Sequence, residues 1–242
     1  FRVEHREKVR QIDDFNEFFV NACSTVADKI PVAGVDAIAN HIKFWADKII
    51  EARKNPQQTI TATLSTGERL QGTIHSDHLH EEVTLVGKCI VLEAAYKQCL
   101  VSPAHSRHAI FCMKNPNSGQ VEFFIARALP FGAATSVHGF NRAAMALIYL
   151  LHENVGTPCT HYFDDFTVII PASLGAIVDE LTGDFLKVLW WNVKREKDKP
   201  TATTFAALGV IFDFTEAINQ EDPRIIVRDK ESRITEVCTT ID

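Results

Sequence analysis

The feature that most constrains the fold is the stretch Tyr162-Phe163-Asp164-Asp165, which carries an apolar run on each side. Residues 158–161 before it and the β-branched run 166–170 after it, stopped by Pro171, are typical of two strands joined by a tight turn. We therefore predict a hairpin with two carboxylates at its tip. Adjacent carboxylates repel each other, and a divalent cation held by oxygen ligands is the usual reason for such a pair. Ordinary turn chemistry is the alternative explanation, because aspartate is common in turns.

Periodic apolar positions predict the elements around this hairpin. An apolar stripe that begins at Val35 predicts a helix ending before Asn55-Pro56. We further expect helices over 137–151 and 177–189, hairpins over 59–74 and 107–128, a buried strand turning into a short helix over 83–96, and a strand pair over 205–214. The order strand, helix, acidic hairpin, helix, strand is that of a split β-α-β unit.

Several short motifs accompany the acidic hairpin in a fixed order. Residues 8–15 read Lys-Val-Arg-Gln-Ile-Asp-Asp-Phe, residues 94–96 Ala-Ala-Tyr, residues 129–132 Leu-Pro-Phe-Gly, residues 140–142 Phe-Asn-Arg, residues 193–197 Val-Lys-Arg-Glu-Lys and residues 208–213 Leu-Gly-Val-Ile-Phe-Asp. Together with Tyr162–Asp165 they resemble the fingers segment and motifs A to E of the reverse transcriptases of retrotransposons and retroviruses. The resemblance runs over residues 6 to 213 in colinear order.

The resemblance implies an α+β fold with two parts. The first is the palm of a right-hand polymerase, a split β-α-β unit whose ferredoxin-like antiparallel sheet has helices on one face. The second is a fingers subdomain, expected in residues 1–84 and in an insertion at 101–130. The palm is expected at 85–100 and 131–215, and residues 216–242 as the start of a thumb or connection, or as a tail.

The resemblance also implies template-directed DNA synthesis, in which two Mg²⁺ (or Mn²⁺) ions stabilise the attacking 3′-oxygen and the leaving pyrophosphate. Asp164 and Asp165 would hold these ions, and Lys197 would approach the pyrophosphate. The alternative for Lys197 is a solvated charged surface, because it lies in a run of charges. The expected partners are an RNA or DNA template-primer and deoxynucleoside triphosphates.

Five further residues are expected to contact the nucleotide. Lys8 and Arg10 match basic side chains of the fingers hairpin that grip the triphosphate, and a solvated charged edge is the alternative. Tyr96 matches a ring that leaves no room for a ribose 2′-hydroxyl, and a ring packed at a strand end is the alternative. Phe131 and Gly132 match the wall beneath the templating base and the incoming nucleotide.

The sequence departs from the family at one position. The family carries its first catalytic aspartate, which bridges both ions, five residues before the motif A tyrosine, and this residue is Val91 here. Glu93 lies two residues further along the strand, on the same face, and offers a substitute ligand at a displaced position. Two alternatives to an active polymerase stay open: a degenerate polymerase fold kept as a nucleic-acid-binding or scaffold module, and another palm-type enzyme such as a nucleotide cyclase.

Composition limits these functions. With 46% hydrophobic and 23% charged residues, the 242-residue chain can bury a sizeable core. No stretch has the apolar length of a membrane span and no basic-then-apolar leader opens the chain, so we expect an intracellular protein that does not enter a membrane. The formal net charge of -6 argues against strong unaided binding to nucleic acid. The six cysteines show no paired spacing and are expected to be reduced core residues.

Two segments carry less information. The histidines and acidic residues of 75–82 match no zinc spacing and favour a solvated polar loop, with a metal site as the alternative. The chain begins at Phe1, within the segment that resembles the fingers, so we expect a fragment of a longer polypeptide. The thumb and other polyprotein domains are then expected in the missing parts.

Overall fold

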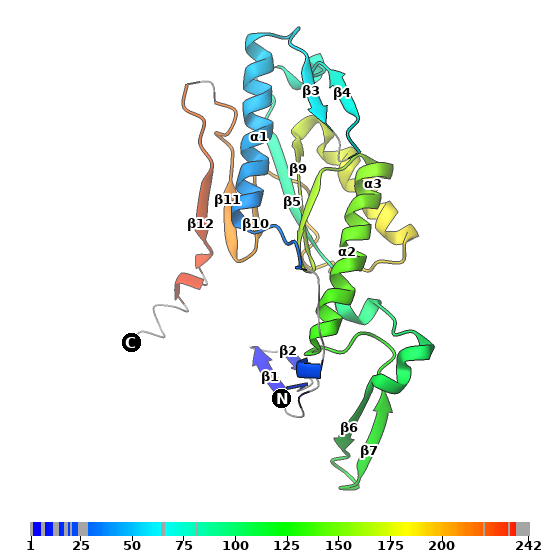
Figure 1. The fold of residues 1–242 in the computed structure, drawn as a ribbon. Helices are drawn as coiled ribbons and strands as arrows, with labels where there is room; N and C mark the ends of the chain where they lie inside the picture. Colours follow the sequence, from blue (N-terminus) through cyan, green and yellow to red (C-terminus); the bar gives the residue numbers. More distant parts are fainter. Residues whose placement is uncertain are drawn as a thin grey trace. The chain divides into compact units, whose positions relative to one another are not determined.

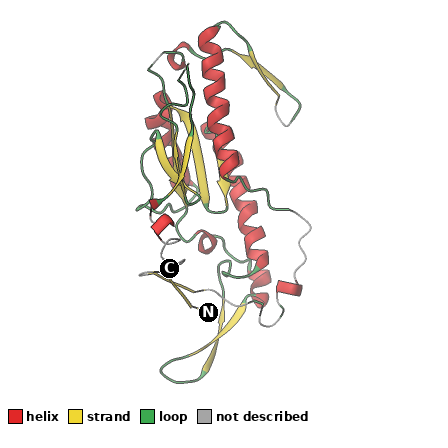
Figure 2. Cartoon of the chain, turned by 90° about the vertical axis from the view of Figure 1, so that its left-hand side faces the viewer, coloured by secondary structure: helices red, strands yellow, loops and turns green. Residues whose placement is uncertain are grey.

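A computed structural model of the chain describes residues 2–5, 8–11, 15, 16, 19, 21–23, 29–63, 66–80, 82–219, 221–231 and 233–235. Helices and antiparallel sheets are mixed along the chain (Figures 1 and 2), as expected for an α+β protein. The chain forms two compact units. The first comprises Phe1–Pro31 and Leu92–Leu147, and the second comprises Val32–Val91 and Ile148–Asp242. Residues 32–84, expected in the fingers, fall in the compact unit that carries the acidic hairpin.

The centre of the second unit is a three-stranded antiparallel sheet. It contains β5 (Leu85–Val91), β9 (Asp165–Pro171) and β8 (Cys159–Tyr162) in the order β5-β9-β8. The predicted hairpin is therefore confirmed as β8 and β9, and the predicted buried strand as β5. Nearly every residue of β5 and β9 is buried, so both faces of this sheet must be covered.

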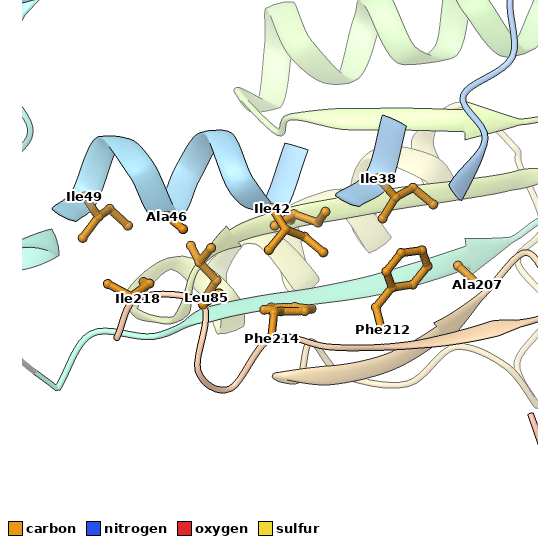
Figure 3. Packing of buried hydrophobic residues seen from close by; sticks show 11 residues of the cluster. Ile38, Ile42, Ala46, Ile49, Leu85, Ala207, Phe212, Phe214 and Ile218 are labelled. Atoms are coloured by element: carbon orange, nitrogen blue, oxygen red, sulfur yellow. The ribbon is translucent and has the colours of Figure 1, made fainter. Parts of the chain in front are cut away.

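Helix α1 (Val35–Lys54) covers one face of the sheet (Figure 3). Its buried residues recur at steps of three or four, which places them on one stripe. Figure 3 shows those that it labels pointing toward Leu85 of β5, Phe212 and Phe214. The buried cluster consists of Ile38, Ile42, Ala46, Ile49, Leu85, Ile169, Ala207, Phe212, Phe214, Ala217 and Ile218. Each fully buried isoleucine, leucine or phenylalanine in it stabilises the fold by about 1.5–3 kcal/mol.

Helix α3 (Gly175–Val188) covers the opposite face. Gly175 approaches the sheet so closely that a Cβ atom there would lie 2.8 Å from the Thr201 hydroxyl and 3.4 Å from a methyl group of Val86. Successive residues of a strand point to opposite faces, so Val86 faces α3 whereas Leu85 faces α1. The expectation of helices on one face only is therefore wrong for this sheet. The physical reason is that β5 and β9 are apolar at consecutive rather than alternate positions.

A second three-stranded sheet lies in the same unit, with β10 (Thr204–Ala207), β11 (Val210–Asp213) and β12 (Ile226–Asp229) paired antiparallel in that order. The strand pair expected at 205–214 is confirmed, and β12 adds a strand in the segment 216–242. The hairpin of β3 (Ile60–Thr63) and β4 (Arg69–Gly72) follows α1 and projects from it in Figure 2.

The first unit contains two further hairpins, β1 (Arg2–His5) with β2 (Lys8–Gln11) and β6 (Ile110–Lys114) with β7 (Val121–Ile125). Helix α2 (Ala134–Val155) begins in this unit and carries the chain into the second. Short 3₁₀ helices occur at Asn21–Cys23, Ser76–His78, Ala95–Gln98, Pro103–His108 and Ala172–Leu174. Within the described part of the chain, none of the helices has both the length and the apolar character that crossing a bilayer requires.

Candidate metal and nucleotide site

The acidic hairpin is closed by a turn with an unusual backbone. Tyr162 and Asp165 are cross-strand partners, so Phe163 and Asp164 form a two-residue connection between β8 and β9. Phe163 has a φ of 52°, in the left-handed region that glycine and asparagine normally occupy in such turns. A left-handed backbone costs about 1–2 kcal/mol for a residue with a side chain, and such strain is concentrated at functional sites. The sequence of this turn is therefore not the one that turn formation alone would favour.

Val91 lies directly beside the acidic pair. It is the last residue of β5 and the cross-strand partner of Asp165, the first residue of β9. Directly opposed residues share a face of the sheet, with Cβ atoms about 4.5–5.5 Å apart. An aspartate at position 91 would therefore bring a third carboxylate to the pair. The valine instead presents two methyl groups and is only 7% exposed.

Two lysines balance the charge of the hairpin. Burial raises the pKa of Asp165, the neighbouring Asp164 raises it further, and Lys197 and Lys230 oppose the rise. Lys197 therefore lies close enough to Asp165 to oppose the rise of its pKa electrostatically. Lys230 follows β12 directly, and its neighbour Asp229 is the cross-strand partner of Val210. Sequence reasoning missed Lys230, because β12 itself was not foreseen.

A pocket of about 560 Å³ opens beside the hairpin, a volume in the range of small-molecule sites. It is lined by Gly34, Val35, Tyr162, Phe163, Asp164, Asp165, Leu208 and Gly209, all in the second unit. The start of α1 is held at this pocket because Ala33 N–H donates a hydrogen bond to His161 O at 2.8 Å. Gly209 has a φ of 87°, and a Cβ atom there would lie 2.8 Å from a guanidinium nitrogen of Arg233. The pocket thus combines two carboxylates with apolar walls and two glycines.

The donor set fits one hydrated divalent ion and does not fit a bridged pair. Mg²⁺ is commonly held by one or two carboxylates together with water and substrate phosphates, which Asp164 and Asp165 can provide in part. Among the residues that the structure describes, no group of three histidine, cysteine or acidic side chains converges on one point. Cys89 lies two residues before Val91 on the same face, but burial, followed by the nearby Asp165, raises its pKa to about 12. Its neutral thiol is a poor ligand at physiological pH.

Tyr96 is packed between two aromatic rings within the first unit. Its ring centroid lies 4.9 Å from that of Phe131 and 4.9 Å from that of Phe140. Asn21 holds the turn that carries Phe131: its side-chain amide donates to Gly132 O at 3.0 Å, and its side-chain oxygen accepts from Ala134 N–H at 2.8 Å. Asn21 therefore satisfies a free N–H at the start of α2. Sequence reasoning missed it, because the partners lie more than a hundred residues apart.

The other expected contacts are only partly described. The backbones of Lys8 and Arg10 lie in β2, paired with His5 and Val3, and their side chains lie outside what the structure describes. Glu93 lies in an exposed turn just after β5. The expected nucleotide residues fall in the first unit and the expected metal ligands in the second, so the structure groups each set only within its own unit.

Two histidines of the histidine-rich segment contact polar side chains. His75 Nδ1 lies 3.5 Å from a carboxylate oxygen of Asp77, and a ring nitrogen of His78 lies 3.0 Å from the Ser173 hydroxyl. Both histidines are on the surface of the second unit.

A scan against known protein families gives no match for this chain, and no curated protein matches it either.

Proposed function

We propose that this chain is the fingers and palm of a retroelement-type reverse transcriptase, in which the acidic hairpin binds a divalent ion together with the triphosphate of a deoxynucleotide. The observation that carries the proposal is the cross-strand pairing of Val91 with Asp165. Position 91 is the one that the motif order assigns to the first catalytic aspartate, and the sheet register brings that position to the other two carboxylates. The order of the motifs and the register of the sheet both support a site at this position.

Each residue of the site would have its own role in binding the ion and the nucleotide. Asp164 and Asp165 would hold one Mg²⁺, which supplies positive charge to a bound triphosphate. Lys197 and Lys230 would add positive charge at the same place. The pocket beside the hairpin offers Tyr162 and Leu208 as apolar surface for a base or sugar. Without a bridging carboxylate at Val91, we expect primer extension to be slower by about two to three orders of magnitude, the loss typical of one preorganised electrostatic contact.

A second function is favoured by the same valine. A polymerase fold that no longer needs catalysis can keep its binding surfaces while its metal ligands change, and a buried valine in place of a ligand is such a change. The chain would then bind nucleic acid as a module of a larger assembly. Binding of a template-primer without any extension would identify this function.

The proposed function is tested in two steps with the 242-residue chain. The first step measures Mn²⁺-dependent binding of dTTP by calorimetry in the unmodified chain and in Asp165→Asn, and we expect binding that the substitution weakens. The second step measures single-nucleotide extension of RNA- and DNA-templated primers by the unmodified chain and by Val91→Asp. We expect faster extension in Val91→Asp, and Asp164→Asn in the Val91→Asp background serves as the inactive control. No dTTP binding in either chain would contradict the proposal.

A further inference from the structure

The segment 194–202 runs along the free edge of β5. This strand lies at the end of the sheet, so its outer backbone groups have no strand partner in the order β5-β9-β8. Lys194 N–H donates to Val91 O at 2.8 Å near one end of the strand. Gly87 and Ala202 exchange two hydrogen bonds, at 2.9 and 3.0 Å, near the other end. The segment is therefore anchored at two points along β5.

A buried cation lies between these two anchors. The side chain of Lys88 is only 10% exposed, and its Nζ lies 3.0 Å from a carboxylate oxygen of Asp179 on α3 and 2.9 Å from one of Asp198 in the segment. Asp179 also accepts hydrogen bonds from the Thr201 N–H at 2.9 Å and from the Thr201 hydroxyl at 3.1 Å. Lys88 thus joins the strand, the helix and the segment through charged contacts.

The two carboxylates keep Lys88 charged. Burial by itself lowers the pKa of a lysine, but the hydrogen bonds and ion pairs with Asp198 and Asp179 outweigh this effect and raise the pKa of Lys88. A lysine is seldom buried unless it is paired, and removing one partner of a buried pair leaves a charge without compensation. The ion pairs of Lys88 therefore restrain the position of residues 194–202.

This restraint acts on the residue next to Asp198. Asp198 N–H and Lys197 N–H both donate to Lys194 O, at 3.1 and 2.9 Å, so residues 194–198 form one tight turn. The same turn is bound to Val91, the cross-strand partner of Asp165. We propose that Lys88 is a positioning residue: by pairing with Asp198 it fixes the segment along β5 and so presents Lys197 to the acidic hairpin. The inference rests on the proposed function, in which Lys197 contacts the triphosphate.

Asp198→Asn is the decisive substitution. It removes one charge of the ion pair while Asp179 still compensates Lys88, whereas Lys88→Met would leave two carboxylates without their cation and endanger folding. The matched control is Asp184→Asn, which breaks the exposed Asp184–Lys187 ion pair on α3. Hydrogen exchange of the Lys194 and Lys197 amides reports the position of the segment without any nucleotide. We expect Asp198→Asn to speed this exchange by about five- to tenfold, and the control to leave it unchanged.

Nucleotide binding then tests whether the restraint serves Lys197. We expect Lys197→Met and Asp198→Asn each to weaken the affinity for Mn²⁺–dTTP by about tenfold, and the double variant to be no weaker than Lys197→Met alone, because both act through one side chain. Unchanged amide exchange in Asp198→Asn, or additive losses in the double variant, would overturn the inference. If the unmodified chain does not bind Mn²⁺–dTTP, the proposed function fails together with the nucleotide role of Lys197, and the exchange rates still decide whether Lys88 restrains the segment.

Discussion

Val91 and Asp165 face each other across the last pair of the β5–β9 ladder, where a buried valine meets a carboxylate. Position 91 is thus close enough to share a cation with the acidic hairpin, but its side chain has no ligand atom. The first prediction concerns what a carboxylate at this position would do.

Without metal, Val91→Asp should lower the free energy of unfolding by about 2 kcal/mol or more, because a third carboxylate is placed in a poorly solvated site next to two others. Saturating Mn²⁺ should restore most of this loss. Thermal unfolding with and without Mn²⁺ measures both effects. Ile90→Asp is the matched control, since Ile90 is equally buried but faces the other side of the sheet. Restoration by Mn²⁺ in the control as well would mean that the effect is not local to the hairpin.

The second prediction concerns the two carboxylates that are present. Asp164→Asn and Asp165→Asn should each weaken Mn²⁺ binding by at least about tenfold, since losing a direct ligand should cost no less than losing a residue that only orients one. Titration of Mn²⁺ followed by electron paramagnetic resonance measures the free ion. Equal affinity in both variants and the unmodified chain would leave the pair as turn residues.

Tyr96 gives a prediction on both stability and sugar selection. Tyr96→Ala should lower the free energy of unfolding by about 3 kcal/mol, because it removes a ring that contacts both Phe131 and Phe140. In any extension that the chain supports, the same variant should accept ribonucleotides more readily, because the 2′-hydroxyl then has room. Tyr96→Phe keeps the ring and should leave sugar selection unchanged. An unchanged ratio of ribonucleotide to deoxynucleotide addition in Tyr96→Ala would make the ring purely structural.

The fourth prediction is a pH dependence of stability. Burial, followed by the charge of His152, lowers the pKa of His41, and the neutral ring accepts a hydrogen bond from the Trp45 indole N–H at 3.2 Å. The folded state therefore binds the proton less readily than the unfolded state does. The free energy of unfolding should fall as the pH drops below about 6.5, the pKa of an unperturbed histidine, and should level off below the lowered pKa of the folded state.

His41→Gln tests this dependence, because it keeps a hydrogen-bond acceptor for Trp45 but cannot take up a proton in this range. Urea unfolding is measured between about pH 7.5 and 5, the range over which histidine titrates. The free energy of unfolding should decline less for His41→Gln than for the unmodified chain. His75→Gln, at an exposed site, should leave the decline as it is. An identical decline in all three proteins would assign it to other groups.

The helices and hairpins were predictable from the sequence because their signals are local. The apolar stripe of α1, the Asn-Pro pair after it and the turn residues between β6 and β7 each act over a few positions. Strand β12 was not predictable in this way, since all four of its residues are exposed and no alternation marks it. Its partner β11 lies on the far side of a polar loop, and such pairing depends on tertiary contacts.

The candidate site was predictable in its carboxylates and not in its surroundings. Asp164 and Asp165 stand out in the sequence because adjacent carboxylates repel each other. Lys230 and Asn21 act on residues far from them in the sequence, and no local pattern reports such contacts. Lys88 did leave a signal, as a lone lysine inside the apolar run 85–91. A charge in a buried strand requires a partner, but the sequence does not tell which of several aspartates provides it.

The coverage of β5 by residues 194–202 also bears on how the protein behaves at high concentration. A seven-residue apolar strand with an open edge can recruit a strand from another molecule, which is a route to aggregation. Here the polar and charged segment 194–202 covers that edge, and the ion pairs of Lys88 hold the segment in position. Freeing this segment is therefore expected to promote self-association as well, whether or not a nucleotide is bound.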